Sequence, residues 1–276
     1  MLIKSKELRQ GYNPITQLEE LEWNDPKNIQ MNFGILRMAL NDSYKLTEGL
    51  EKAILIMQGE VSLKWGDDNV VVKRESFFDD NPTVLLVPST IQIEITCLNI
   101  ESELCIVETK NDTQYPPKLF TADKCLTEKF GKGTLRETST RDVRTIFDMN
   151  NMPESNLVLG EVINYPGKWS SYPPHGHNQP EIYYYRFLPS QGFGFSMDGM
   201  DNAHIIRDGD ALLVLNGAVH SQTSAPGYAM YYIWAIRHLD EDPYGPDDPR
   251  KFIPEHTWVM DSENNSKIWP PEEKEY

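Results

Sequence analysis

Four side chains in the second half of the sequence have the types and the spacing of a metal site. His175 and His177 are two residues apart, so both imidazoles project from the same face of an extended segment. Glu181 follows at the start of a tyrosine-rich apolar run, and His220 comes at the end of a second apolar run. Three neutral imidazoles and one carboxylate suit one borderline divalent metal ion, zinc first, with manganese, iron or nickel as alternatives.

The elements that must position these ligands are predicted to be strands. Short strand patterns separated by Gly, Pro, Asn and Asp clusters dominate residues 30–110 and 157–238. Residues 91–95 alternate between apolar and polar side chains, as in a half-buried strand. Helical periodicity is weak, and the only stretches that favour it are residues 14–22 and the residues after Thr121. We therefore expect an all-β chain.

The strand patterns fall into two halves. Residues 110–117 between them are polar and end in two prolines, as a crossover between domains should. Both halves run from a Gly-bounded hairpin through a polar loop to an apolar strand, which suggests a duplicated barrel. All six histidines lie in the second half. We expect an N-terminal barrel over residues 1–115 without metal ligands and a C-terminal barrel over residues 116–276 with the metal site.

Composition narrows the classes of partner. The 276 residues carry a formal net charge of -16, which repels nucleic acids and anionic lipid surfaces, so neither is an expected partner. No run of 18 apolar residues occurs, so we expect no membrane association and a location in the cytoplasm. The cysteines, Cys97, Cys105 and Cys125, form no C-x-x-C pair, and we interpret them as inert thiols in a reducing compartment.

The ligand pattern resembles the two motifs of the cupin superfamily. Residues 175–181 resemble H-x-H-x3-E, which is followed here by Gly192, and residues 209–220 resemble G-x5-P-x-G-x2-H. Leu215 stands where the second motif has proline, but Gly217 keeps its register. The resemblance implies a bicupin, with two jelly-roll-like β-barrels in one chain.

A closer resemblance covers most of the chain and is strongest from about residue 130 to 235. The sequence is similar to that of the 5-deoxy-glucuronate isomerase family of myo-inositol catabolism. The similarity lies in residues 169–175, 181–187, 191–195, 225–228 and 231–232. That family is related to the 5-keto-4-deoxyuronate isomerases of pectin breakdown. Two features depart from the family pattern, a short loop between His177 and Glu181 and the pair Arg237–His238 after the last strand.

The resemblance implies aldose–ketose isomerisation of an open-chain deoxyuronate, 5-deoxy-glucuronate to 2-deoxy-5-keto-gluconate. A divalent ion would stabilise the charge that develops on the substrate oxygens. The implied partners are a small sugar acid and further copies of the chain in a homo-oligomer. A 5-keto-4-deoxyuronate isomerase, a cupin dioxygenase and a non-catalytic sugar-binding cupin are the alternatives, because the ligand set alone does not distinguish them.

Catalysis also needs a proton relay. Alternation from Glu181 places Tyr183 and Tyr185 on the ligand face of their strand and turns Tyr184 away. Tyr183 and Tyr185 are therefore catalytic candidates, and Lys168, at the expected pocket mouth before the ligands, is a third that could pair with the substrate carboxylate. For both tyrosines the alternative is aromatic packing inside the barrel, and for Lys168 it is a solvated surface lysine.

The substrate-binding candidates are Trp169 and Tyr172 at the expected pocket mouth, Arg141 in an alternating strand and Tyr232 on the last strand. Either Arg141 or Arg144 could face inward, and a barrel-closing salt bridge is the alternative for each. The remaining histidines, His204, His238 and His256, lack ligand spacing and are interpreted as structural or surface residues. The acidic tail, residues 270–276, is expected to lie loose on the surface.

Overall fold

The computed structural model describes residues 1–245 and 247–269, and within them strands dominate. The helical elements there are short 3-10 helices: η1 (Leu18–Glu20), η2 (Ala122–Lys124), η3 (Leu135–Glu137), η4 (Pro254–Met260) and η5 (Ser262–Lys267). Two of them, η1 and η2, lie in the stretches in which the sequence favours helical periodicity. None of the helices in the described part of the chain has the length and apolar character needed to span a membrane. The all-β prediction is confirmed, and the predicted loose tail lies outside the described residues.

The first half of the chain forms one curled set of nine connected strands. Six of them follow the order β10-β7-β5-β9-β3-β2, and β4, β6 and β8 extend the set through pairings with β5 and with one another. We call this set the first barrel. Its strands are β2 (Gly11–Thr16), β3 (Asn32–Ala39), β4 (Ser43–Leu46), β5 (Glu51–Trp65), β6 (Asp68–Arg74), β7 (Val84–Val87), β8 (Ile93–Cys97), β9 (Glu101–Thr109) and β10 (Lys118–Phe120).

The second half forms a matching set, which we call the second barrel. One sheet has the order β1-β19-β16-β21-β13-β12-β11, and a second has the order β14-β20-β17-β18. The strands of the first sheet are β1 (Leu2–Ile3), β11 (Leu126–Phe130), β12 (Arg141–Phe147), β13 (Leu157–Asn164), β16 (Glu181–Leu188), β19 (Ala211–Val214) and β21 (Ala229–Arg237). The others are β14 (Trp169–Ser170), β17 (Phe193–Met197), β18 (Ala203–Arg207) and β20 (Gln222–Ser224), with β15 (His175–Gly176) pairing with β22 (Lys251–Phe252).

The barrels exchange their edge strands. β1, from the start of the chain, pairs with β19 of the second barrel, and Leu2 lies opposite Leu212. β10, from after the crossover segment, pairs with β7 of the first barrel, and Leu119 lies opposite Leu85. The domain boundary at residue 115 stays a prediction. A strand from before this boundary pairs with the second barrel, and a strand from after it pairs with the first.

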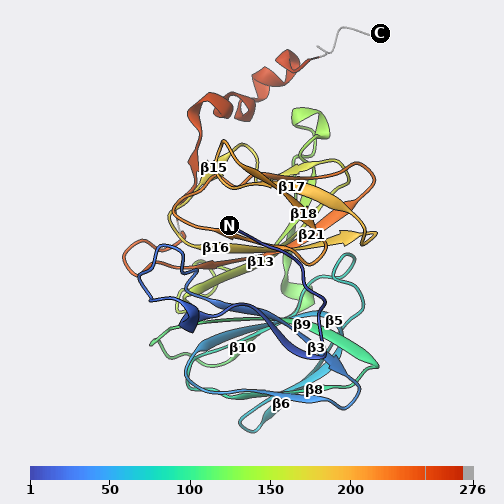
Figure 1. Cartoon of the computed structure of the whole chain (residues 1–276), viewed down its shortest axis with the longest axis vertical. Helices are drawn as coiled ribbons and strands as arrows, with labels where there is room; N and C mark the ends of the chain where they lie inside the picture. Colours follow the sequence, from blue (N-terminus) through green and yellow to red (C-terminus); the bar gives the residue numbers. More distant parts are fainter. Residues whose placement is uncertain (246, 270–276) are drawn as a thin grey trace.

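Three apolar clusters fill the molecule. One lies inside the first barrel, one lies inside the second, and the largest is shared by the facing sheets of both. In Figure 1 the two barrels are stacked along the long axis, with β3, β5 and β9 in one and β13, β16 and β21 in the other. Successive residues of these strands point to opposite faces of the sheet. Apolar residues on one face therefore pack in the barrel interior, and those on the other face pack in the contact between the barrels.

A buried ionic group joins the two barrels across this contact. Arg74, at the end of β6, makes hydrogen bonds of 2.7 and 2.8 Å to the two carboxylate oxygens of Glu161 on β13. Arg144 on β12 lies 3.4 Å from the same carboxylate, and the Tyr231 hydroxyl donates to it at 2.5 Å. Glu161 is fully buried. Arg144 is thus the arginine of the predicted pair that forms a salt bridge.

Candidate metal centre

Antiparallel pairing of β16 with β19 brings the predicted ligands together. Glu181 is the first residue of β16 and lies opposite Val214, the last residue of β19. The chain then turns through Asn216 and Gly217, both with positive φ, and returns to place His220 beside Glu181. Gly217 suits this left-handed turn because it has no Cβ. The turn forms with leucine at position 215, where the cupin motif has proline.

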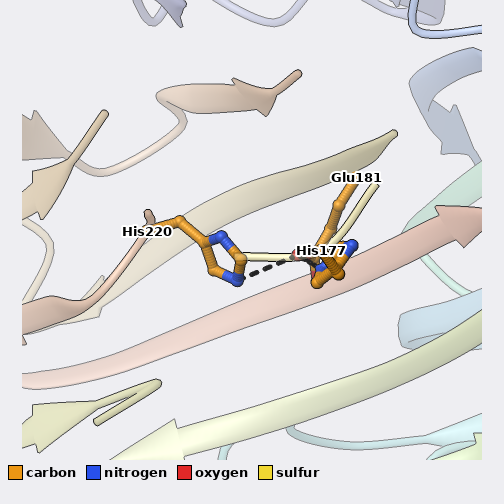
Figure 2. A group of neighbouring side chains, drawn as sticks. All are labelled: His177, Glu181 and His220. Atoms are coloured by element: carbon orange, nitrogen blue, oxygen red, sulfur yellow. Dashed lines mark hydrogen bonds and ion pairs between the residues drawn. The ribbon is translucent and has the colours of Figure 1, made fainter. Parts of the chain in front are cut away.

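Three of the four predicted ligands form a tight group (Figure 2). The candidate ligand atoms of His177, Glu181 and His220 all lie within 4.8 Å of one another. Nε2 of His177 is 3.1 Å from Oε2 of Glu181, and Nε2 of His220 is 3.5 Å from the same oxygen. All three side chains are buried. Two imidazole nitrogens thus converge on one carboxylate oxygen, which is an arrangement that a small cation could occupy.

Backbone carbonyls orient two of the imidazoles. Nδ1 of His220 lies 2.8 Å from the carbonyl oxygen of Ala218, and Nδ1 of His175 lies 2.8 Å from that of Pro173. A ring that donates from Nδ1 to a carbonyl has a lone pair on Nε2, which is the atom a metal needs. The residues present therefore fit a borderline divalent ion by donor type, burial and orientation.

The protonation states agree with that fit. Burial, followed by the neighbouring His220, lowers the pKa of His175 to about 4. Burial also lowers the pKa of His220. Burial alone would raise the pKa of Glu181, but the hydrogen bond with His177, followed by the electrostatic effect that His220 has when it is protonated, outweighs it and lowers that pKa. At neutral pH the two histidines are neutral and the glutamate is ionised, as ligands must be.

His175 lies beside this group and is not a member of it. Its ring centroid is 5.1 Å from that of His220 and 5.2 Å from that of Phe252. Its backbone is held by the pairing of β15 with β22, in which His175 lies opposite Phe252. Its role as the fourth ligand stays a prediction.

The ligands open into a cavity of about 130 Å³ in the second barrel. Of the predicted catalytic and substrate-binding residues, Arg141, Tyr183 and Tyr232 line it. Arg141 has no carboxylate within salt-bridge distance among the described residues, and its guanidinium donates to the backbone and side chain of Ser139. The Tyr232 hydroxyl is 2.5 Å from that of Ser170. An unneutralised cation and two phenols thus face the metal ligands.

The other predicted residues lie outside the cavity wall. Tyr185 is fully buried behind Tyr183, and its hydroxyl donates to Gln222 at 2.5 Å. Trp169 is exposed on the outer face of β14, and its ring centroid is 5.8 Å from that of Tyr172. Lys168, the residue before β14, is half-buried. The substrate contacts predicted for Lys168, Trp169 and Tyr172 therefore stay predictions.

Sequence reasoning missed several residues that line the cavity, and two of them, Tyr244 and Arg250, have ionisable side chains. Both come from the chain after β21, where prolines, glycine and aspartates read as a plain loop. The sequence indicates only that this loop is too rich in turn residues to form another barrel strand. It does not indicate which part of the barrel the loop contacts. The ring of Tyr244 meets that of His177 edge-on, with centroids 5.0 Å apart.

The remaining histidines do not belong to the ligand group. His204 lies 3.2 Å from Asp198, and His256 is half-buried in η4. His238 is buried, and its Nδ1 accepts the backbone N–H of Tyr244 at 2.9 Å. His238 thus anchors the segment that carries one of the missed residues.

Comparisons with known proteins agree with the fold. The model of the KduI/IolB family matches residues 2–259. A 5-deoxy-glucuronate isomerase of Geobacillus thermodenitrificans is 28% identical over 245 residues, covering 81% of this chain and 83% of that protein. One of Bacillus licheniformis is 26% identical over 280 residues, covering 94% and 97%.

Solved structures show the same architecture. An IolB-like protein of Salmonella typhimurium superimposes with a TM-score of 0.79 at 21% identity, covering 94% of this chain and 99% of that one. An oxalate decarboxylase of Lactobacillus farciminis has a TM-score of 0.65 at 11% identity, covering 95% and 90%. At these identities the structures show a shared fold and nothing finer.

Proposed function

Because this chain is an isomerase of the KduI/IolB family, we propose that it converts 5-deoxy-glucuronate to 2-deoxy-5-keto-gluconate with one divalent metal ion. The substrate is proposed from the names of the curated relatives, which are 5-deoxy-glucuronate isomerases. The observation that carries the metal is the buried group of His177, Glu181 and His220, which opens into a cavity lined by Arg141.

The proposed metal site uses the three grouped side chains, with His175 as its fourth ligand. A bound divalent ion supplies Lewis-acid stabilisation of the charge that develops on the substrate oxygens. Zinc is the first expectation, with manganese, iron or nickel as alternatives, since three imidazoles and a carboxylate accept all of them.

The protein's own groups have separate proposed roles. Burial, followed by the charge of Glu181, raises the pKa of Tyr183 well above its usual value, so its hydroxyl stays protonated and can donate to a substrate oxygen. Arg141 gives the cavity a positive charge that favours an acid substrate over a neutral sugar. Tyr232 and Ser170 form a neutral hydroxyl pair on the cavity side of their strands. Tyr185 packs beside Tyr183, with the two ring centroids 6.1 Å apart, and helps to hold it in place.

A 5-keto-4-deoxyuronate isomerase is the second candidate, because the sequence resembles a family related to these enzymes and the ligand group fits either substrate. The curated isomerase relatives disfavour the cupin dioxygenase and the non-catalytic sugar-binding cupin.

The test is to incubate purified, metal-analysed protein with 5-deoxy-glucuronate and to follow aldehyde loss and ketone formation by NMR. We expect conversion that a chelator abolishes and that added zinc or manganese restores. Conversion of 4-deoxy-5-ketouronate alone would transfer the proposal to the second candidate. Oxygen consumption during turnover would contradict isomerisation.

A homo-oligomer in the cytoplasm is proposed from the same family likeness. One feature supports association: an apolar row crosses the outer face of the four-stranded sheet, where Trp169, Thr223, Phe195 and Ile205 lie in register. Three of these side chains are exposed apolar residues, and a patch of this kind marks contact surfaces. Light scattering should give a multiple of the chain mass for the wild type and a lower mass for Phe195→Glu. Ile100→Glu, at an exposed apolar position of the first barrel, is the matched control.

A further inference from the structure

The chain after β21 returns to the metal centre and closes one side of it. We call the described residues 239–245 and 247–252 the C-terminal segment. Its last two residues form β22, which pairs with β15 and so with His175. The Gln179 amide donates to the carbonyl of Asp242 at 2.6 Å, and Asn178 donates to the carboxylate of Asp242 at 2.7 Å. The segment is therefore fastened at both ends to the loop that carries the ligands.

The metal cavity adjoins a second cavity of about 340 Å³, and the C-terminal segment contributes to the walls of both. The two cavities share four wall residues, Val143, Trp234, Tyr244 and Arg250. Cavities that hold small-molecule ligands usually measure roughly 300–1,000 Å³. The metal cavity, at about 130 Å³, is smaller than that. An open-chain sugar acid with its carbonyl at the metal centre can extend to the boundary between the cavities.

Arg250 lies at that boundary in a fixed orientation. Its Nε and Nη2 donate to the two oxygens of Asp248 at 2.7 and 2.8 Å, and its guanidinium lies 5.2 Å from the ring centroid of Phe252. Within the described residues Nη1 has no hydrogen-bond partner. The side chain is 42% exposed, as expected for a residue at a cavity mouth. Arg250 thus has one free donor group and needs little rearrangement to bind an anion.

The other charged groups of the second cavity limit where an anion can lie. Its wall contains three carboxylates, Asp148, Asp247 and Asp248. These repel a negative charge that moves deeper, whereas the free Nη1 group of Arg250 can donate to an anion at the boundary. Lys168, the carboxylate contact that the sequence suggested, lines neither cavity.

We propose that Arg250 binds the carboxylate of the substrate at the boundary between the two cavities, so that the C-terminal segment adds to the preference for sugar acids that the charge of Arg141 gives the metal cavity. This inference rests on the proposed function, in which the opposite end of the same open chain reacts at the metal centre. Arg250 acts as a specificity-determining residue and not as an acid or base.

The test compares wild type with Arg250→Met, which keeps the apolar stem and removes the guanidinium. KM for 5-deoxy-glucuronate should rise at least about 10-fold while kcat changes little, because a carboxylate far from the reacting atoms is bound equally in ground and transition states. Calorimetry with D-glucuronate as the probe should show a similar loss of affinity. Arg250→Lys should recover part of it. Arg136→Met, at an exposed arginine outside both cavities, is the matched control.

The outcomes separate this inference from the proposed function. A wild type that isomerises the substrate, together with an Arg250→Met variant of unchanged KM and glucuronate affinity, overturns the assignment of Arg250 alone. The calorimetric comparison does not depend on turnover, so equal glucuronate affinity in both proteins overturns it even without an active preparation. A wild type that neither converts 5-deoxy-glucuronate nor binds glucuronate overturns both.

Discussion

At the scale of single residues, alternation along β16 divides the side chains between two environments. Tyr183 and Tyr185 lie in the interior of the second barrel, with Glu181 at the start of the same face. Ile182 and Tyr184 belong to the core between the barrels. The strand period therefore places a ligand and a candidate acid next to each other, with the Tyr183 ring centroid 5.8 Å from that of His220.

The grouping of the ligands predicts unequal effects of two histidine substitutions. His220→Ala removes a member of the tight group and should lower metal affinity by more than about 100-fold, a larger loss than substitutions around a metal site usually cause. His175→Ala should cost less, because His175 lies beside that group. Metal analysis after dialysis measures both. Circular dichroism is the control, and a variant that unfolds would show that the metal has a structural role.

Tyr183→Phe tests the proton relay. The variant should bind metal normally and lose about 100-fold or more in kcat, the usual range for general acid–base groups. Tyr185→Phe is the matched comparison, since Tyr185 is equally buried but its hydroxyl is bound to Gln222 and does not line the cavity. Steady-state rates with equal metal content decide between them. Unchanged turnover in Tyr183→Phe would assign this tyrosine to packing.

At the scale of elements, the two barrels have equivalent strands. Glu181 on β16 lies opposite Val214 on β19, and Lys52 on β5 lies opposite Val87 on β7. The exchanged edge strands extend this correspondence, because Leu2 opposite Leu212 matches Leu119 opposite Leu85. Lys52 therefore occupies the position that corresponds to the candidate ligand Glu181.

This correspondence explains why only one barrel has a candidate metal centre. The Lys52 side chain is fully buried, and its ammonium donates to the carbonyl of Leu50. Burial lowers the pKa of Lys52. A lysine in place of a carboxylate puts a cationic side chain where a ligand would have to be negative, and the first barrel contains no histidine.

The exchange of edge strands predicts that the first residues stabilise the distant barrel. Deletion of residues 1–5 removes β1, the hydrogen bond of 2.8 Å from Leu213 to Met1 and the bond of 2.6 Å from Ser5 to the buried Asp210. We expect the thermal midpoint to fall by about 5 °C or more, since each lost hydrogen bond contributes to stability and Asp210 loses a partner. Scanning calorimetry measures it, with Lys6→Ala as the control. An unchanged midpoint would show that β1 contributes nothing.

At the scale of the whole molecule, the contact between barrels depends on one buried carboxylate. Glu161→Ala leaves Arg74 and Arg144 buried without their anion, and this loss should reduce the free energy of unfolding by roughly 3–5 kcal/mol. Urea unfolding measures the change. Glu94→Ala, which removes an exposed partner of Lys45, should leave the midpoint unchanged. Equal stability of the Glu161 variant and the wild type would show that apolar packing alone holds the barrels together.

The sequence alone determined the residue types and their local spacing, and these were enough for the all-β class, the ligand candidates and the family. Spacing of two in an extended segment and a glycine turn before His220 are local constraints, so they can be read without a structure. The alternation of Tyr183 and Tyr184 is local in the same way.

Only the tertiary structure decided which segments meet. Arg250 reaches the cavity because β22 pairs with a strand some 75 residues earlier, and Leu2 lies in the second barrel although it begins the chain. Arg141 and Arg144 look alike in sequence, yet Arg141 lines the cavity and Arg144 forms an ion pair with Glu161, its partner on the neighbouring strand β13. Such partners are fixed by long-range packing and burial of charge, which leave no periodic signal in the residues themselves.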